Sequence, residues 1–316
     1  MTEGRKEQHE PRISVVLPVY EEAETVQRLI PEIVERLDQE GATFEIIAVD
    51  DGSLDETPDV LKALKRQHPQ HLRVVRHLYN KGNGAALRTG TRVAGGEVVV
   101  YMDADGQHSP SDIPKLIAKI PPYDLVIGAR TKNYQSSWHR RAANNFYNRF
   151  ASWLSDTEVK DLTSGFRALR RAVAIHFLPL YPSGFSSPTT VTMSFLKAGY
   201  NVTFVPIDVG TRRAGRSKIN LWRDGSNFVL IILRMIMLYD PLRIFLPTGI
   251  ILVLLGLLTW IAGLIQAGRL VLPNSSLFLF IAALLTLLLG LVAGQIASSR
   301  VYYHGDETIL VDDQPQ

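Results

Sequence analysis

Hydrophobic residues in the first two thirds of the chain follow two different periods. Short apolar runs rich in β-branched residues predict buried strands, and these runs lie at 13–19, 44–49, 72–75, 98–102 and 125–128. The segments between them repeat apolar residues at helical spacing. The clearest such segment has six of them on one face: Val26, Leu29, Ile30, Ile33, Val34 and Leu37. Pro31 interrupts this pattern, which predicts either a kinked helix or a helix that begins there.

The order of these elements predicts the fold class. Strands and helices alternate in short units, which is typical of an α/β domain with a mostly parallel, doubly wound, Rossmann-like sheet. Ligands bind to such sheets at the carboxyl ends of the strands. Candidate functional residues are therefore expected directly after each predicted strand.

The last quarter of the chain has a different pattern. Residues 245–265 and 277–296 are almost uncharged, and each stretch of about 20 residues is long enough to cross a bilayer. The alternative is a buried helical pair in a large soluble core, but two uninterrupted stretches of this length are rare in soluble proteins. We therefore expect a transmembrane hairpin, which also offers a surface for a homo-oligomer.

Arginines around the hairpin predict its orientation. Arg234 and Arg243 precede the first span and Arg300 follows the second, whereas Arg269 is the one charged residue in the short loop between the spans. The positive-inside rule places both ends of the hairpin, and the domain before it, in the cytoplasm. The sequence thus predicts a multi-pass protein of the cell membrane.

The change in hydropathy divides the chain into five segments. Residues 219–243 mix aromatic and aliphatic residues with charges, as interfacial amphipathic helices do. The expected segments are a flexible tail at 1–11, a catalytic α/β domain at 12–218, the interfacial helices at 219–243, the hairpin at 244–299 and a cytoplasmic tail at 300–316.

Composition excludes several classes of function. The net charge of the 316 residues is only +3, which does not argue for a nucleic-acid partner. The absence of cysteine excludes disulfides, thiol nucleophiles and cysteine-ligated zinc. The charged segment 1–12 lacks the apolar run of a signal peptide.

The fourth predicted strand ends in the most informative motif. Asp103 and Asp105 follow it with one residue between them, and Gln107 comes two residues later. Alternate residues of an extended segment point the same way, so both carboxylates can face the carboxyl edge of the sheet. Hard oxygen ligands of this kind suit Mg²⁺ or Mn²⁺ that also binds substrate phosphates. The competing interpretation is a solvated turn after a strand.

Three further motifs follow the other predicted strands. Pro18–Glu22 closes the first strand, Val49–Asp55 closes the second, and Asn80–Gly84 opens the helix before the fourth. Together with the Asp-x-Asp motif, this pattern resembles the family 2 glycosyltransferases with the GT-A fold. The narrower resemblance is to the dolichyl- and polyprenyl-phosphate sugar synthases, which include the dolichol-phosphate mannose synthases. It covers roughly residues 13–218, and a C-terminal hairpin is typical of membrane-anchored members.

The resemblance implies how a nucleotide-sugar donor would bind. The residues it assigns to the nucleotide are Pro18, Tyr20, Glu22, Val49, Asp51, Asp103 and Ala104. Asp103, Asp105 and Gln107 would hold the metal and the diphosphate. Arg212, Ser217 and Lys218 match a mobile loop that closes over the sugar, and Arg212 is also a candidate catalytic residue with Asp103, Asp105 and Arg130.

The resemblance also implies an acceptor site. Arg130, Arg140 and Asn144 match positions that receive the phosphate of the lipid. Gly165, in the segment Ser164–Arg167, stands where some relatives have an aspartate proposed as a base. An ionised lipid phosphate needs no such base, so the absence fits this acceptor.

The expected activity is an inverting transfer of one hexose from a nucleotide-sugar, either GDP-mannose or a UDP-hexose, to polyprenyl or dolichyl phosphate. Two alternatives stay open: a membrane glycosyltransferase that extends a glycan or glycolipid, and a non-catalytic membrane scaffold that only binds nucleotide. The first lacks support, because the sequence has no Gln-x-x-Arg-Trp motif and one hairpin is too small for an export channel.

Overall fold

The computed structural model describes residues 12–131, 138–183, 187–208, 236–268 and 272–301. Contacts divide the chain into two units, residues 1–218 and residues 219–316. The first unit contains the α/β fold and the second contains two long helices.

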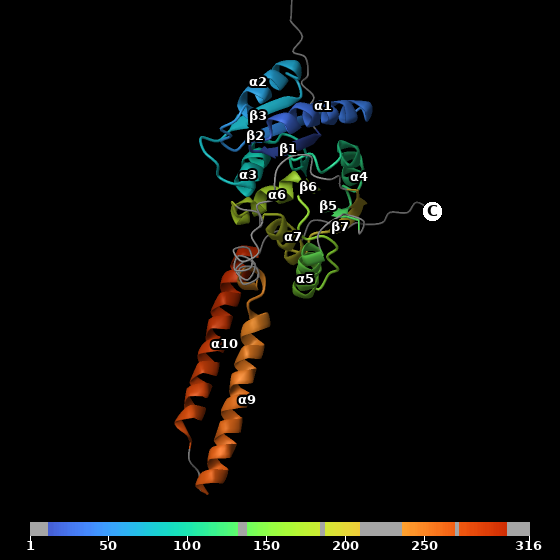
Figure 1. Ribbon diagram of the computed structural model, residues 1–316. Coiled ribbons are helices and arrows are strands. Elements are labelled where there is room, and N and C mark those ends of the chain that lie inside the picture. The colour runs from blue at the N-terminus through green and yellow to red at the C-terminus, as the bar shows by residue number, and fades with distance from the viewer. Residues whose placement is uncertain (1–11, 132–137, 184–186, 209–235, 269–271, 302–316) are drawn as a thin grey trace, which may run out of the picture. The chain divides into compact units, whose positions relative to one another are not determined.

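A seven-stranded sheet forms the centre of the first unit (Figure 1). Its strands are β1 (Ile13–Val19), β2 (Phe44–Asp50), β3 (Leu72–Arg76), β4 (Val98–Tyr101), β5 (Leu125–Arg130), β6 (Arg167–Arg170) and β7 (Val202–Ile207). Their order across the sheet is β3-β2-β1-β4-β6-β5-β7. All neighbouring pairs are parallel except those of β6, which runs antiparallel to β4 and β5. The predicted mostly parallel sheet is confirmed.

The antiparallel direction of β6 decides which residues reach the functional edge. Parallel strands end at one edge of the sheet, and an antiparallel neighbour begins at that edge. The residues just before Arg167 therefore lie where β4 and β5 end. The sequence pattern did not predict β6, because its four residues Arg167–Arg170 hold only two apolar side chains.

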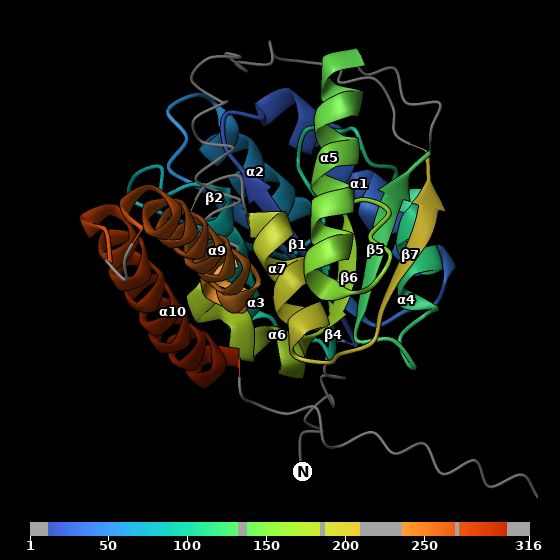
Figure 2. The ribbon, with the colours of Figure 1, turned by 90° about the horizontal axis from the view of Figure 1, so that it is seen from below.

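Helices cover both faces of the sheet (Figure 2). They are α1 (Ala23–Gln39), α2 (Thr57–Gln67), α3 (Asn83–Val93), α4 (Ile113–Ile117), α5 (Trp138–Ser155), α6 (Arg171–Phe177) and α7 (Ser187–Lys197), with short 3-10 turns η1 (Pro110–Asp112) and η2 (Leu178–Leu180). Buried residues of α1, α2 and α4 share one hydrophobic cluster, and those of α3, α6 and α7 share another. The predicted doubly wound arrangement is therefore present.

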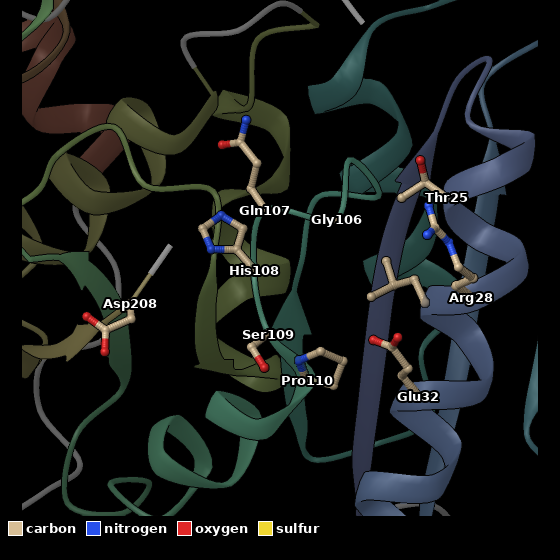
Figure 3. A pocket seen from close by; sticks show the side chains of 10 residues that line it. Thr25, Arg28, Glu32, Gly106, Gln107, His108, Ser109, Pro110 and Asp208 are labelled. Atoms are coloured by element: carbon tan, nitrogen blue, oxygen red, sulfur yellow. The ribbon is translucent and has the colours of Figure 1, made fainter. Parts of the chain in front are cut away.

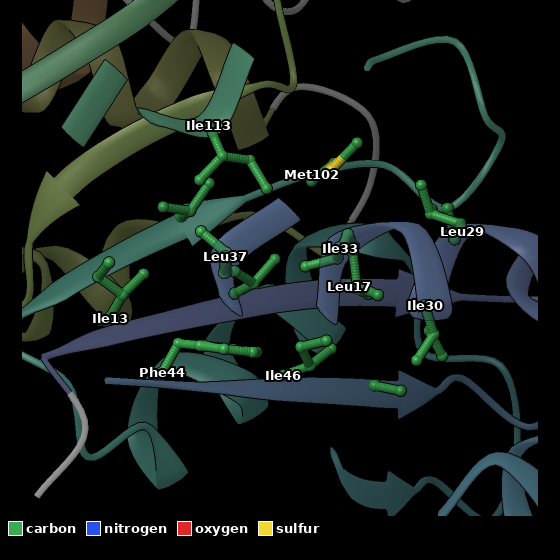
Figure 4. Packing of buried hydrophobic residues seen from close by; sticks show 14 of the residues in the cluster. Ile13, Leu17, Leu29, Ile30, Ile33, Leu37, Phe44, Ile46, Met102 and Ile113 are labelled. Atoms are coloured by element: carbon green, nitrogen blue, oxygen red, sulfur yellow. The ribbon is translucent and has the colours of Figure 1, made fainter. Parts of the chain in front are cut away.

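Strand residues alternate between the two clusters, as a pleated sheet requires. In β1, Val15 and Leu17 belong to the cluster under α1, whereas Val16 belongs to the cluster under α3. Figure 4 shows the first cluster, in which Ile33 and Leu37 of α1 lie over the strands.

Pro31 lies inside α1 rather than at its start. The helix begins at Ala23 and continues through the proline to Gln39. Of the two alternatives, a helix that begins at Pro31 is therefore excluded. All six apolar residues of the predicted face are buried, and their burial explains why the helix continues. Burying such a face offsets the cost of one lost backbone hydrogen bond.

The second unit contains a helical hairpin of α9 (Leu242–Ala267) and α10 (Asn274–Val301). Stretches of 25 and 26 residues in these helices contain 18-residue windows with mean hydropathies of 2.4 and 2.7, so both helices are long and apolar enough to cross a membrane. Most of the predicted interfacial segment lies outside the described residues.

Glycines in α9 allow close approach of α10. A Cβ atom built at Gly256 would lie 2.7 Å from the ring of Phe280, and one at Gly249 would lie 2.7 Å from Leu287. Small residues at a helix interface are a common means of packing in membranes, where van der Waals contact replaces the hydrophobic effect. The packing of the hairpin thus depends on contact between the backbone of α9 at these glycines and large side chains of α10.

We expect Gly256→Ala to weaken the hairpin by about 1–3 kcal/mol, because the new methyl group overlaps the Phe280 ring. The measurement is the melting temperature of the purified chain in detergent. Gly294→Ala is the matched control, since its Cβ would meet Leu242 at 3.5 Å, an ordinary contact. Equal melting temperatures for the two variants would contradict this packing.

Candidate active site

Asp51 anchors the loop between β3 and α3. It follows β2 and is 3% exposed. Its Oδ1 accepts a hydrogen bond from the backbone N–H of Lys81 (2.9 Å) and lies 2.6 Å from Nδ1 of His77, while Oδ2 accepts from the N–H of Gly82 (2.7 Å). Nε2 of His77 lies 2.9 Å from Oγ1 of Thr89 in α3. The residue expected to reach the nucleotide base therefore also fixes the loop that leads to α3.

Hydrogen bonds to side-chain hydroxyl groups also join the segment after β1 to the segment after β2. The backbone N–H of Glu21 donates to Oγ of Ser53 (3.0 Å), and that of Glu22 donates to Oγ1 of Thr57 (3.1 Å). Gly52 has φ +75°, and a Cβ there would lie 2.5 Å from the backbone of Tyr79. Only glycine tolerates both the conformation and the contact.

The expected nucleotide-binding residues differ in accessibility. Tyr20 is 39% exposed, and Pro18 lies at the end of β1. Val49 and Ala104 are buried in the core, so any contact with a ligand would come from their backbone atoms. Glu22 precedes α1, where its Oε2 accepts a hydrogen bond from Thr25 (2.7 Å).

Asp103 and Asp105 lie in the loop after β4, which ends at Tyr101. Both side chains are partly exposed. Oδ1 of Asp103 accepts a hydrogen bond from Nδ2 of Asn83, at the start of α3 (3.3 Å). Oδ1 of Asp105 accepts from the backbone N–H of Gln107 (3.1 Å). Within the described residues, no group of three or more His, Cys, Asp or Glu side chains is arranged to hold a metal ion.

Gly165 packs directly against Asp103. A Cβ atom at this glycine would lie 2.2 Å from Oδ2 of Asp103. The close approach follows from the antiparallel direction of β6, since Gly165 comes just before that strand. The position therefore has no room for a side chain while the Asp103 carboxylate keeps its place.

Arg130, at the end of β5, is held by an aspartate that the sequence analysis missed. Nε and Nη2 of Arg130 donate to Oδ2 and Oδ1 of Asp161, each at 2.8 Å. Burial raises the pKa of Asp161, but the hydrogen bonds and charge of Arg130 outweigh it, so the pKa lies below its ordinary value. In the sequence, the only signal for Asp161 is its position shortly before the segment Ser164–Arg167.

Arg167 is a second buried arginine near these residues. It is 1% exposed, and it donates to the backbone oxygen atoms of Pro188 (2.9 Å) and Ser164. Burial lowers its pKa to about 10, so it remains charged at neutral pH. These contacts attach the segment before β6 to the first turn of α7.

A cavity of about 290 Å³ lies beside the loop after β4. Figure 3 shows Arg28 and Glu32 from α1 on one side, with Gln107 and His108 from the loop on the other. The His108 ring stacks on Phe166 at 5.1 Å, and burial lowers its pKa to about 4. The neutral ring of His108 therefore packs against Phe166, beside the loop after β4.

The remaining expected residues are only partly described. Arg140 and Asn144 lie in α5, but their side chains are outside the described part of the chain. Arg212, Ser217 and Lys218 also lie outside the described residues. The structure thus brings together Asp103, Asn83 and Gly165, and separately Arg130 and Asp161.

Comparison with known proteins identifies the family. Residues 14–178 match the family model of glycosyl transferase family 2. The chain belongs to this family. Residues 240–299 match a second model, the GtrB C-terminal hairpin, which agrees with the apolar hairpin of α9 and α10 and indicates membrane association.

Two relatives carry the same name, undecaprenyl-phosphate 4-deoxy-4-formamido-L-arabinose transferase. The protein from Enterobacter sp. (strain 638) is 30% identical over 212 residues, which cover 67% of this chain and 64% of that protein. The protein from Proteus mirabilis (strain HI4320) is 32% identical over 162 residues, which cover 51% of this chain and 50% of that protein. The matches thus span only about half to two thirds of these relatives.

A solved structure of low sequence identity has the same fold. Glucosyl-3-phosphoglycerate synthase from Mycobacterium tuberculosis, in complex with Mn²⁺, uridine diphosphate and phosphoglyceric acid, superposes with a TM-score of 0.55. The alignment covers 72% of this chain and 78% of that chain at 22% identity. The likeness confirms the GT-A-like fold expected from the sequence.

The ion pair of Arg130 with Asp161 predicts a pH-dependent stability. A carboxyl group with a lowered folded-state pKa stabilises the fold above its unfolded pKa, and this contribution is lost as pH falls through the folded value. We expect Asp161→Asn to lower the free energy of unfolding by about 2–3 kcal/mol at pH 7. The difference from the wild type, measured by urea unfolding, should shrink below about pH 4. A constant difference from pH 7 to pH 3 would contradict this assignment.

Proposed function

We propose that this protein transfers a sugar from a nucleotide-sugar to polyprenyl phosphate, with inversion at the anomeric carbon. The observation that carries the proposal is the segment 161–165, which contacts both candidate subsites. Asp161 binds Arg130 at the end of β5, and Gly165 packs on Asp103 after β4. The segment thus contacts both Asp103, a carboxylate suited to the donor side, and Arg130, an arginine suited to an anionic acceptor.

The donor side is formed by residues after β1, β2 and β4. Tyr20 and Asp51 are assigned to the nucleoside, and Asp103 and Asp105 to the diphosphate. The comparison structure with Mn²⁺ and uridine diphosphate supports a donor of this chemical class.

The residues after β4 fit a divalent metal ion. Asp103, Asp105 and Gln107 are hard oxygen donors, and Gly165 keeps the space beside Oδ2 of Asp103 clear of any side chain. Mg²⁺ or Mn²⁺ bound there would neutralise charge on the departing nucleoside diphosphate. Asn83 would hold Oδ1 of Asp103 in place through its hydrogen bond.

The absence of a carboxylate at position 165 supports a phosphate acceptor. A hydroxyl acceptor needs a base to become nucleophilic, whereas a phosphate monoester is already mostly ionised at pH 7. Its oxygen attacks the anomeric carbon, and the bond from that carbon to the diphosphate breaks. Arg130, Arg140 and Asn144 are assigned to hold the acceptor phosphate, and Arg212, Ser217 and Lys218 are assigned to close over the donor sugar.

The relatives guide the choice of substrates. Both are named for undecaprenyl phosphate, which supports a polyprenyl phosphate acceptor. Their named sugar is a modified arabinose, a pentose, so they do not favour the hexose expected from the sequence. Both classes of sugar therefore belong among the donors to be tested.

The location of the substrates follows from the hairpin. We propose that α9 and α10 span the cell membrane and that the domain of residues 12–218 faces the cytoplasm, with 219–243 at the interface and 300–316 as a cytoplasmic tail. Flanking arginines support this orientation. A lipid-linked phosphate at the membrane surface would then be accessible to a tethered domain.

The test is transfer of labelled sugar to undecaprenyl phosphate by the full chain in detergent. UDP- and GDP-linked hexoses and pentoses are compared in the presence of Mg²⁺ or Mn²⁺. EDTA should abolish transfer, and Asp105→Ala should lower the rate at least about 100-fold, the scale of a lost electrostatic stabiliser. Asp59→Ala, which changes an exposed aspartate of α2 that pairs with Lys62, is the control. Nucleotide binding without transfer from any donor would favour the scaffold alternative, and full activity of Asp105→Ala in EDTA would exclude the proposed metal site.

Gly165→Ala tests the donor site in a second way. The added methyl group would displace the Asp103 carboxylate, so we expect affinity for the nucleoside diphosphate with Mn²⁺ to fall about tenfold, as misplacement of a binding group does. Calorimetric titration without acceptor measures this affinity. Ala118→Gly, a change of similar size in the turn after α4, is the control. Unchanged affinity in a folded Gly165→Ala variant would show that Asp103 does not need this space.

A further inference from the structure

The side chain of Arg130 is held at both Nε and Nη2 by the segment that precedes β6. Nε and Nη2 donate to the two oxygen atoms of Asp161, and Nη2 also donates to Oγ1 of Thr163 at 2.5 Å. The guanidinium has one donor on Nε and two on each terminal nitrogen. The edge formed by Nε and Nη2 is thus directed at Asp161 and Thr163, which fixes the plane of the guanidinium.

Asp161 is itself held on several sides. The side chain is 8% exposed, and its oxygen atoms accept additional hydrogen bonds from the backbone N–H groups of Arg130 (3.2 Å) and Thr163 (3.2 Å). A carboxylate with this many donors has its charge largely compensated. It therefore orients the arginine without presenting a bare negative charge to an anionic ligand.

The same segment is attached to α5. Oδ1 of Asn148 accepts a hydrogen bond from the backbone N–H of Leu162 (3.0 Å), and its Nδ2 donates to the backbone oxygen of Lys160 (2.7 Å). Asn148 lies one turn beyond Asn144 and two turns beyond Arg140 on this helix. The residues at 160–163 thus connect the end of β5 with the helix that contains the other expected acceptor residues.

We propose that Asp161 is a positioning residue for the acceptor phosphate: it fixes the guanidinium of Arg130 at the end of β5, and Asn148 attaches the segment of this ion pair to α5. This inference rests on the proposed function and adds residues that the family resemblance did not assign. Asp161 acts through Arg130 and does not itself touch substrate. Its loss should affect the acceptor and leave the donor site intact.

The experiment compares Asp161→Asn with Asp124→Asn in the full chain in detergent. Asp124 is the matched control because it is also a buried aspartate next to β5, at the opposite end of the strand, and it pairs with Arg170 at 3.0 Å. Binding of undecaprenyl phosphate, with undecaprenol as the probe that lacks the phosphate, is measured by thermophoresis. Donor affinity is measured separately by titration with the nucleotide.

We expect Asp161→Asn to raise the dissociation constant for undecaprenyl phosphate about tenfold, with donor affinity changed less than twofold. Asp124→Asn should lower the melting temperature but leave both affinities within twofold. Thr163→Val, which removes one acceptor of Nη2 at nearly constant volume, gives a milder variant if Asp161→Asn does not fold. It should weaken acceptor binding about threefold.

The outcomes separate the two proposals. A wild-type chain that binds undecaprenyl phosphate no better than undecaprenol overturns the proposed function, and the positioning role with it. A wild type that binds the phosphate, with unchanged acceptor affinity in folded Asp161→Asn and Thr163→Val, overturns only the positioning role. Equal losses of acceptor and donor affinity, or the same loss of acceptor affinity in Asp124→Asn, would show a general structural effect and would also overturn it.

Discussion

Buried carboxylates at the carboxyl edge of the sheet organise the first unit of this protein. A buried charge is costly unless hydrogen bonds and an opposite charge compensate it. Asp51 meets this requirement with two backbone N–H groups and His77, and Asp161 meets it with Arg130 and Thr163. In both cases the donors include backbone N–H groups of a loop, so satisfying the carboxylate also fixes that loop. The candidate active site is built on this constraint.

The antiparallel strand β6 brings the buried carboxylate of Asp161 to this edge of the sheet. Because β6 begins where β4 and β5 end, the residues that precede it enter the site from between two functional strands. Asp161 then reaches Arg130, Gly165 approaches Asp103, and Arg167 attaches the segment to α7. One short segment thereby couples the position of Arg130, proposed to bind the acceptor, to that of Asp103, proposed to lie on the donor side. Because of this coupling, Gly165 and the buried Asp161 matter to the geometry of the site as much as the partly exposed Asp-x-Asp motif does.

The hairpin follows different physics from the domain before it. Its helices are apolar on most sides, so the pattern that identifies it is total hydropathy rather than amphipathic periodicity. Contact between α9 and α10 depends on glycines that admit side chains such as Phe280 and Leu287 to the backbone. Membrane attachment can therefore be encoded without any residue that takes part in chemistry.

The sequence by itself determined the features that repeat locally or follow a strand: the apolar strands, the face of α1, the two spans, and the carboxylates after β2 and β4. Each depends on periodicity or on neighbouring residues, which are visible along the chain. Only the tertiary structure decided the direction of β6, the contact of Gly165 with Asp103 and the pairing of Asp161 with Arg130. The last two residues are separated by 31 positions, and no local pattern encodes which buried carboxylate meets which arginine. That choice is made when the sheet forms, because the strand order brings the two charges together in a place where neither can remain unpaired.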